Sequence, residues 1–215
     1  MKQGLTELIF ILDRSGSMGG LEKDTIGGYN SLLEKQKAVI GECRITTVLF
    51  DHQAELLHDR TDVQAVTLMT DTDYRVGGST ALLDAIGSTI NKIGNAIKHT
   101  ADDYRPEKVL VVIITDGEEN ASRFYGSDQV KAMIKRQQDK YRWEFIFLGA
   151  NIDAVETASR YGIRADRASR YHNDKAGVDL NYGSMSQTIV NLRVNKTIDD
   201  NWKQSIDDDY QKRSK

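Results

Sequence analysis

The sequence predicts an α/β fold with a doubly wound, mostly parallel central sheet of about six strands. One antiparallel strand is expected at an edge of this sheet, and helices are expected on both faces. Two observations lead to this prediction. The short, continuously apolar runs at residues 8–12 and 109–114 are typical of parallel strands that are buried on both faces. Segments with helical spacing alternate with such runs, which favours β-α-β units.

The first half of the chain supplies the first strand, a helix and an edge hairpin. After residues 8–12, helical spacing joins Ile26, Tyr29, Leu32, Leu33, Gln36 and Ile40. Gly27 and Gly28 interrupt this helix, so they mark either close packing or a kink. Residues 43–50 are rich in β-branched side chains and predict the next strand, with residues 54–58 as its antiparallel partner. The polar segment 60–78 predicts a long loop with one helical turn at 63–66.

The second half continues the alternation of helices and strands. A helix is expected to start at Thr80, because its apolar face is spaced as Leu82, Ile86, Ile90, Ile93 and Ile97. A strand at 109–115, a short helix over 130–137 and a strand at 143–148 follow. Asp153 then begins another helix, which Gly162 ends.

The carboxyl-terminal part predicts a boundary near residue 195. Residues 1–195 are expected to form a single domain, followed by a polar segment at 196–215 that is either helical and packed on the domain or partly disordered. The packed form is favoured by a narrow apolar stripe, which consists of Ile198, Trp202, Ile206 and Tyr210. The alternative is a helix that docks another protein, in which case Trp202 would be exposed.

Composition limits the functions to consider. With 215 residues, 39% of them hydrophobic, the chain is long enough for a sizeable core. The net charge of −3, without a basic stripe, argues against binding of nucleic acid. Cys43 is the single cysteine, so an intramolecular disulfide is impossible, and a reducing compartment is expected. Because residues 8–12 are too short for a signal peptide or a membrane span, we expect a cytoplasmic protein without a membrane partner.

A group of oxygen-bearing side chains follows the first strand. Asp13, Ser15 and Ser17 occupy alternate positions of one turn, where open α/β sheets bind ligands. Oxygen ligands suit Mg²⁺ or Mn²⁺ and disfavour Zn²⁺. The same residues also serve in ordinary turns and helix caps, and that alternative stays open for the triplet alone.

Two distant segments add to this group. Thr80 follows Gly77, Gly78 and Ser79, and Asp116 follows the strand at 109–115. Taken separately, Thr80 could be a helix cap, and Asp116 with Gly117 could be a turn that closes the strand.

Together the three segments resemble the motif pattern of the von Willebrand factor A domain family over about residues 5–165. The resemblance is to a stand-alone, bacterial-type cytoplasmic member. It implies a Rossmann-like fold and a complete metal-ion-dependent adhesion site. It further implies that the five side chains of this site surround one divalent ion, some directly and some through water: Asp13, Ser15, Ser17, Thr80 and Asp116.

Such a site predicts a metal-dependent protein-binding module that is not an enzyme. Asp13 and Asp116 would balance the charge of the ion and leave it attractive to a carboxylate of a partner that presents Asp or Glu. Rim contacts are expected from Arg14, Gly78, Glu118 and Asn151. The resemblance also implies, as an alternative, an accessory subunit of an ATPase-containing or chelatase-type complex. An ion that only stabilises the loops is a further alternative.

A magnesium-dependent phosphotransferase or phosphatase that uses Asp13 is the enzymatic alternative. Enzymes of the haloacid dehalogenase type need a second carboxylate two residues after the first, and Ser15 stands there. A serine hydrolase elbow would need Gly-x-Ser-x-Gly, which the residues around Ser17 do not supply. The sequence also lacks the Gly-Lys-[Ser/Thr] signature of a phosphate-binding loop.

Overall fold

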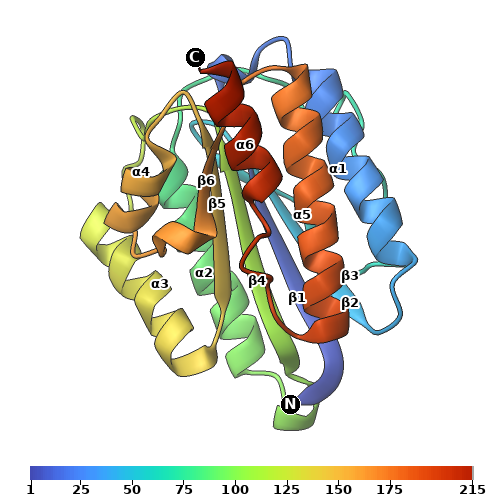
Figure 1. The fold of residues 1–215 in the computed structure, drawn as a ribbon. Coiled ribbons are helices and arrows are strands. Elements are labelled where there is room, and N and C mark those ends of the chain that lie inside the picture. Colours follow the sequence, from blue (N-terminus) through green and yellow to red (C-terminus); the bar gives the residue numbers. More distant parts are fainter. Residues whose placement is uncertain (215) are drawn as a thin grey trace.

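The computed structural model describes residues 1–214 and contains a six-stranded sheet with helices on both faces (Figure 1). The strands are β1 (Lys2–Asp13), β2 (Cys43–Phe50), β3 (Ala54–Asp62), β4 (Pro106–Thr115), β5 (Glu144–Ala150) and β6 (Ala168–Tyr171). Their order is β3-β2-β1-β4-β5-β6, and only the β2–β3 pair is antiparallel among the described strands. The predicted doubly wound sheet with one antiparallel edge strand is therefore confirmed.

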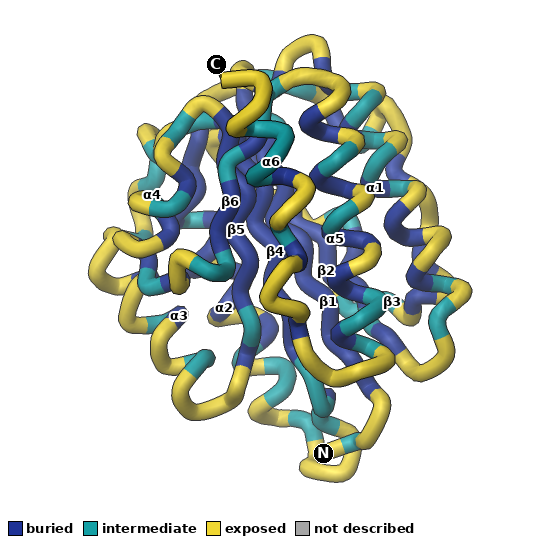
Figure 2. Tube along the Cα trace, in the orientation of Figure 1, coloured by how far each residue is buried: buried dark blue, intermediate teal, exposed yellow. Residues whose placement is uncertain are grey.

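Each face of the sheet is covered by three of the described helices. The first face carries α1 (Glu22–Lys37), α5 (Lys175–Asn195) and α6 (Gln204–Arg213), and the second carries α2 (Leu82–Lys98), α3 (Ser127–Tyr141) and α4 (Ala154–Arg160). Side chains of β1 alternate between two buried clusters, with Phe10 and Leu12 on the first face and Ile9 and Ile11 on the second. The central strands are accordingly buried over most of their length (Figure 2).

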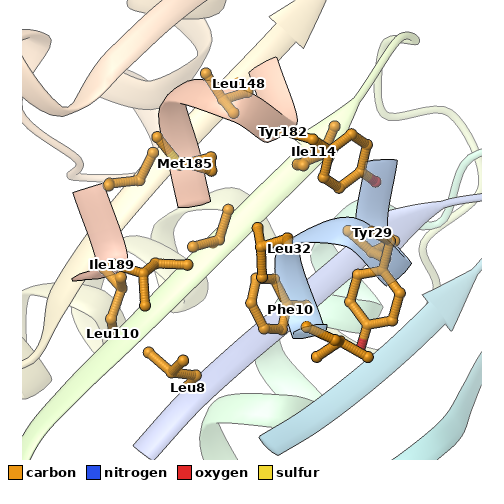
Figure 3. Close-up of a cluster of buried hydrophobic side chains, with 14 of the residues drawn as sticks. Leu8, Phe10, Tyr29, Leu32, Leu110, Ile114, Leu148, Tyr182, Met185 and Ile189 are labelled. Atoms are coloured by element: carbon orange, nitrogen blue, oxygen red, sulfur yellow. The ribbon is translucent and has the colours of Figure 1, made fainter. Parts of the chain in front are cut away.

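The core of the first face fixes α1 and α5 against the centre of the sheet. Figure 3 shows Tyr29 and Leu32 of α1 next to Phe10 of β1, while Met185 and Ile189 of α5 cover the neighbouring strands. The rings of Phe10 and Tyr29 meet edge to face with centroids 5.5 Å apart. This packing holds the strand that ends at Asp13.

The glycine pair in α1 marks close packing. A Cβ atom at Gly28 would lie 2.4 Å from Cδ2 of Tyr182 in α5, whereas a Cβ atom at Gly27 would contact nothing within 4 Å. The helix runs without interruption from Glu22 to Lys37 and includes both glycines.

Alanine at these two glycines is expected to have opposite effects. Gly27→Ala should raise the free energy of unfolding by about 0.5–1 kcal/mol, since it removes a flexible residue from a helix interior. Gly28→Ala should lower it by about 1–3 kcal/mol, because the Tyr182 ring must shift. Urea unfolding of the two variants measures both values. Equal effects would contradict close packing at Gly28.

Some predicted boundaries change. β1 begins at Lys2, with a shift in its pairing to β4 between Lys2 and Thr6. The edge strand β3 continues to Asp62. α2 begins at Leu82 with Ala81 as its cap, so the helix starts two residues later than the predicted start at Thr80. This shift leaves the Thr80 side chain outside the helix.

The segment after residue 195 packs on the sheet. Trp202 and Ile206 are 6% and 1% exposed, and the Trp202 indole donates a hydrogen bond of 2.9 Å to the carbonyl of Asp166. The alternative of an exposed docking Trp202 is therefore wrong, because the side chain belongs to the core under α6. Lys215, the last residue of the predicted segment, lies outside the described residues. Within residues 1–214, no helix has the length and apolarity needed to cross a membrane.

Candidate metal centre

The candidate site lies where β1 and β4 end side by side. These neighbours run parallel in the middle of the sheet, with Leu12 paired to Ile114, so Asp13 and Thr115 reach the same edge. From β1 the chain winds outward to β2 and β3 and then returns to β4 on the other side. Open α/β sheets bind ligands at such a reversal of strand order.

Asp13 is held at the end of β1 by two short hydrogen bonds. Its Oδ1 accepts from the backbone N–H of Ser15 at 2.7 Å, and its Oδ2 accepts from the hydroxyl of Thr115 at 2.6 Å. The residue is 1% exposed. Burial raises the pKa of Asp13, and the hydrogen bonds from Thr115 and Ser15 only partly counter this effect.

Asp116 and the two serines form a continuous chain of contacts. The Ser15 and Ser17 hydroxyl oxygens lie 3.1 Å apart, and the Ser17 hydroxyl donates to Oδ1 of Asp116 at 2.5 Å. Burial also raises the pKa of Asp116, although Ser17 and Asn173 donate hydrogen bonds to it. The turn after β1 thus meets the turn after β4 through side-chain oxygens.

Thr80 completes the group from a third loop. A Cβ atom placed on Gly117 would lie 3.3 Å from both the Ser17 and the Thr80 hydroxyl oxygens, so these two oxygens flank Gly117. The Thr80 N–H donates to Oδ1 of Asn120 at 2.9 Å, and the Asn120 N–H donates to the Thr80 carbonyl at 3.0 Å. The glycine gives Thr80 room to approach the end of β4.

The loop before Thr80 is also joined to the turn after β1. The Gly16 N–H donates to the Gly78 carbonyl at 3.1 Å, and the Gly77 N–H donates to the Arg14 carbonyl at 2.9 Å. Gly78 has φ of +74°, a conformation that favours glycine. Three loops that are remote in sequence therefore bring the five predicted side chains to one place.

The donor set fits a hard divalent cation. It comprises two carboxylates and three hydroxyls, the oxygen ligands that Mg²⁺ and Mn²⁺ prefer. A cation would offset the unfavourable burial of the two carboxylates. Within residues 1–214, no three side chains of His, Cys, Asp or Glu gather as a metal site, so any ion here must depend on the hydroxyls.

Sequence reasoning missed Asn173, which touches the candidate site. Its Nδ2 donates to Oδ2 of Asp116 at 2.8 Å from the loop between β6 and α5. Its own Oδ1 is buried and, within the described chain, has no hydrogen-bond partner. Asp174 next to it caps α5 by accepting from the Gly177 N–H, a signal that could have located this loop.

The four predicted rim residues lie in different surroundings. Gly78 and Glu118 are exposed beside Thr80 and Asp116 respectively. Asn151 is exposed at the end of β5, which is two strands from β1, a distance of about 10 Å across the sheet. The Arg14 side chain is only 13% exposed and pairs with Asp51 and Glu55 at 3.1 and 2.9 Å. These carboxylates come from the turn after β2 and from the start of β3, and they neutralise the guanidinium charge of Arg14.

Known structures share the fold of this chain, although their sequences differ from it. Neither a family model nor a curated protein matches the sequence. A von Willebrand factor type A structure from Catenulispora acidiphila has 14% identity and a TM-score of 0.59, covering 86% of this chain and 42% of that one. The ArnB paralog VWA2 from Sulfolobus acidocaldarius has 21% identity and a TM-score of 0.51, covering 86% and 44%. The manganese-loaded TRAP protein of Plasmodium vivax has 15% identity and a TM-score of 0.57, covering 84% and 73%.

This chain therefore spans less than half the length of the first two of these proteins. At these identities the similarity concerns the fold alone. The strand order, the antiparallel edge strand β3 and the helices on both faces of the sheet agree with this similarity in fold. The chain thus has the Rossmann-like fold of von Willebrand factor A domains.

Proposed function

We propose that this chain is a metal-dependent protein-binding module. Mg²⁺ or Mn²⁺ would be held by Asp13, Ser15, Ser17, Thr80 and Asp116. One observation carries the proposal. The side-chain oxygens of Ser17, Thr80 and Asp116 lie close together near Gly117, at the sheet edge where β1 ends with Asp13. The manganese found in the TRAP structure supports a divalent cation on this fold.

The charges of the site favour an acidic partner. A bound divalent cation would supply a positive centre that accepts a carboxylate oxygen from outside the chain. Asp13 and Asp116 together carry a formal charge that balances the ion, whereas the three hydroxyls add none. Thr115 and Asn173 orient the two carboxylates through hydrogen bonds of 2.6 and 2.8 Å. The partner is proposed to present an Asp or Glu side chain.

The same arrangement disfavours phosphoryl transfer. Ser15 stands two residues after Asp13 and carries no carboxylate for general acid–base catalysis. Its hydroxyl oxygen lies 3.1 Å from that of Ser17. We expect no turnover of p-nitrophenyl phosphate above background with Mg²⁺ present. Turnover that is abolished by Asp13→Asn would replace the binding function with an enzymatic one.

The experiment that tests the binding function compares immobilised wild-type protein with immobilised Asp116→Asn protein. Both are loaded with lysate in Mg²⁺ and then washed with EDTA. A protein that binds only the wild type and elutes with EDTA supports a bridging ion. A partner that stays bound after chelation would show that any ion is structural, and would contradict the proposal.

Metal binding is also expected to depend on pH. The pKa values of Asp13 and Asp116 are raised by burial, so protons bind these carboxylates at higher pH than they bind an ordinary aspartate. Protons therefore compete with the cation, and Mg²⁺ affinity should fall on acidification while the pH is still above the ordinary pKa of 3.8. Calorimetric titrations from pH 7 down towards the ordinary pKa of 3.8 measure this. Affinity that stays constant until the pH has fallen to that value would contradict ligation by these two residues.

A further inference from the structure

Phe124 is an aromatic side chain displayed on the loop that follows Asp116. The loop joins β4 to α3, and Phe124 is 82% exposed within it. Arg123 beside it is also exposed. Large exposed aromatic side chains are common anchors in protein interfaces when the backbone that carries them is already ordered.

The backbone at Phe124 is held by one carboxylate of α2. Asp84 accepts from the N–H groups of Arg123, Phe124 and Tyr125 at 2.8, 2.9 and 2.8 Å. The Ser122 hydroxyl accepts from the Asp84 N–H at 3.0 Å. Tyr125 packs against Gly87, where a Cβ atom would lie 2.3 Å from its ring. Three backbone bonds and a packed neighbour thus fix the loop while the Phe124 ring faces solvent.

The earlier part of this loop is tied to the candidate metal centre. Asn120 exchanges two hydrogen bonds with the backbone of Thr80, and Glu119 accepts from the Leu83 N–H at 2.8 Å. Glu119 also accepts from the N–H groups of Ala121 and Ser122 at 2.9 and 2.7 Å. Phe124 and the oxygens of the site therefore belong to one hydrogen-bonded unit.

We propose that Phe124 is a second contact point for the protein that the metal centre binds. The partner would be a segment with two features, an Asp or Glu that reaches the cation and an apolar side chain that packs on the Phe124 ring. Arg123 would favour a further acidic group in that segment, by charge complementarity. This inference rests on the proposed function, because the metal centre supplies the first contact.

The spacing of the two features follows from the chain geometry. Thr80 and Asp84 are four residues apart, so their Cα atoms are separated by at most about 14 Å, and Asp84 bonds directly to the Phe124 backbone. An extended peptide covers about 3.3 Å per residue. The acidic and apolar residues of the partner are therefore expected no more than about six positions apart in an extended segment.

Selection from a random peptide library displayed on phage tests this inference. The library is bound to the wild-type protein in Mn²⁺, and bound phage are eluted with EDTA. Selected peptides should share an acidic residue and an aliphatic or aromatic residue at the expected spacing. A synthetic copy of one such peptide should bind Phe124→Ser at least about tenfold more weakly than the wild type. Tyr104→Ser provides the matched control, since Tyr104 is 60% exposed at the other end of β4, and it should leave affinity unchanged.

The outcomes separate this inference from the proposed function. Two results would overturn the role of Phe124 and leave the metal-dependent function standing. The first is a set of selected peptides that share only the acidic residue. The second is a selected peptide that binds Phe124→Ser as tightly as it binds the wild type. Failure to obtain EDTA-eluted acidic peptides would overturn both. Because the Phe124 ring is exposed, thermal unfolding of Phe124→Ser should match that of the wild type, which verifies that the variant is folded.

Discussion

Asp116→Asn should reduce the affinity for Mg²⁺ and Mn²⁺ at least about 100-fold while the protein stays folded. The change removes one of the two formal charges of the donor set. The amide can keep the local contacts, because its oxygen can accept from Ser17, and its nitrogen can donate to the Asn173 oxygen, which has no partner within the described residues. The Asn173 amide needs only to rotate. Isothermal titration calorimetry measures the change in affinity.

The metal-free form of this variant should be at least as stable as the metal-free wild type at pH 7. The folded-state pKa of Asp116 is raised, so ionisation of this residue weakens folding as the pH rises above its ordinary value of 3.8. Asparagine removes that loss, and the difference between the two proteins should vanish below this pH. Thermal unfolding with and without Mg²⁺ checks this, and only the wild type should be stabilised by the ion.

Asp153→Asn is the control for the metal experiment. Asp153 caps α4 by accepting from the Glu156 N–H at 3.0 Å, a role that asparagine also fills. Its variant should retain the wild-type affinity for metal. Unchanged affinity in Asp116→Asn would instead place the ion somewhere else in the protein.

Arg60→Met should lower the free energy of unfolding by about 3–5 kcal/mol. Glu7 in β1 is 0% exposed, and both of its carboxylate oxygens accept from the Arg60 guanidinium, at 3.0 and 2.9 Å. Removal of the guanidinium leaves a buried charge without its counterion. Urea unfolding, followed by circular dichroism, measures the loss.

The double variant Glu7→Leu/Arg60→Met should recover most of this loss, because it also removes the buried charge. Lys92→Met is a matched control, since the Lys92–Asp59 pair has side chains that are 41% and 51% exposed. It should change stability by less than about 0.5 kcal/mol. A small effect of Arg60→Met alone, or a double variant as unstable as the single one, would show that Glu7 does not depend on its partner.

The central strands and their terminal aspartates were predictable because burial on both faces demands continuous apolar runs. β1 and β4 contain such runs and lie next to each other at the point where the strand order reverses. Asp13 is the last residue of β1 and Asp116 directly follows β4, so their meeting at one edge follows from the fold class. The structure adds that the Thr80 hydroxyl lies next to Gly117, where the absence of a side chain leaves room for it.

Other features depend on contacts that no local pattern contains. β6 has four residues, of which Ser169 and Arg170 are polar, so its run is too short and mixed to indicate a buried strand. Asn173 follows it and was missed for the same reason. Glu7 and Arg60 meet only because β2 and β3 fold back beside β1. Exposure of Phe124 likewise follows from the hydrogen bonds to Asp84, not from its own sequence neighbours.

The proposed metal centre is tested most directly by the relaxation of water protons in a titration of Mn²⁺ into the protein. We predict one Mn²⁺ per chain with at least one exchangeable water, whose relaxation enhancement falls when acetate is added as a carboxylate ligand. Asp116→Asn should show no such bound ion. Two results would contradict the proposal that these side chains hold an ion with a position free for a partner carboxylate. One is a relaxation enhancement that does not change when acetate is added, and the other is equal binding of Mn²⁺ by Asp116→Asn.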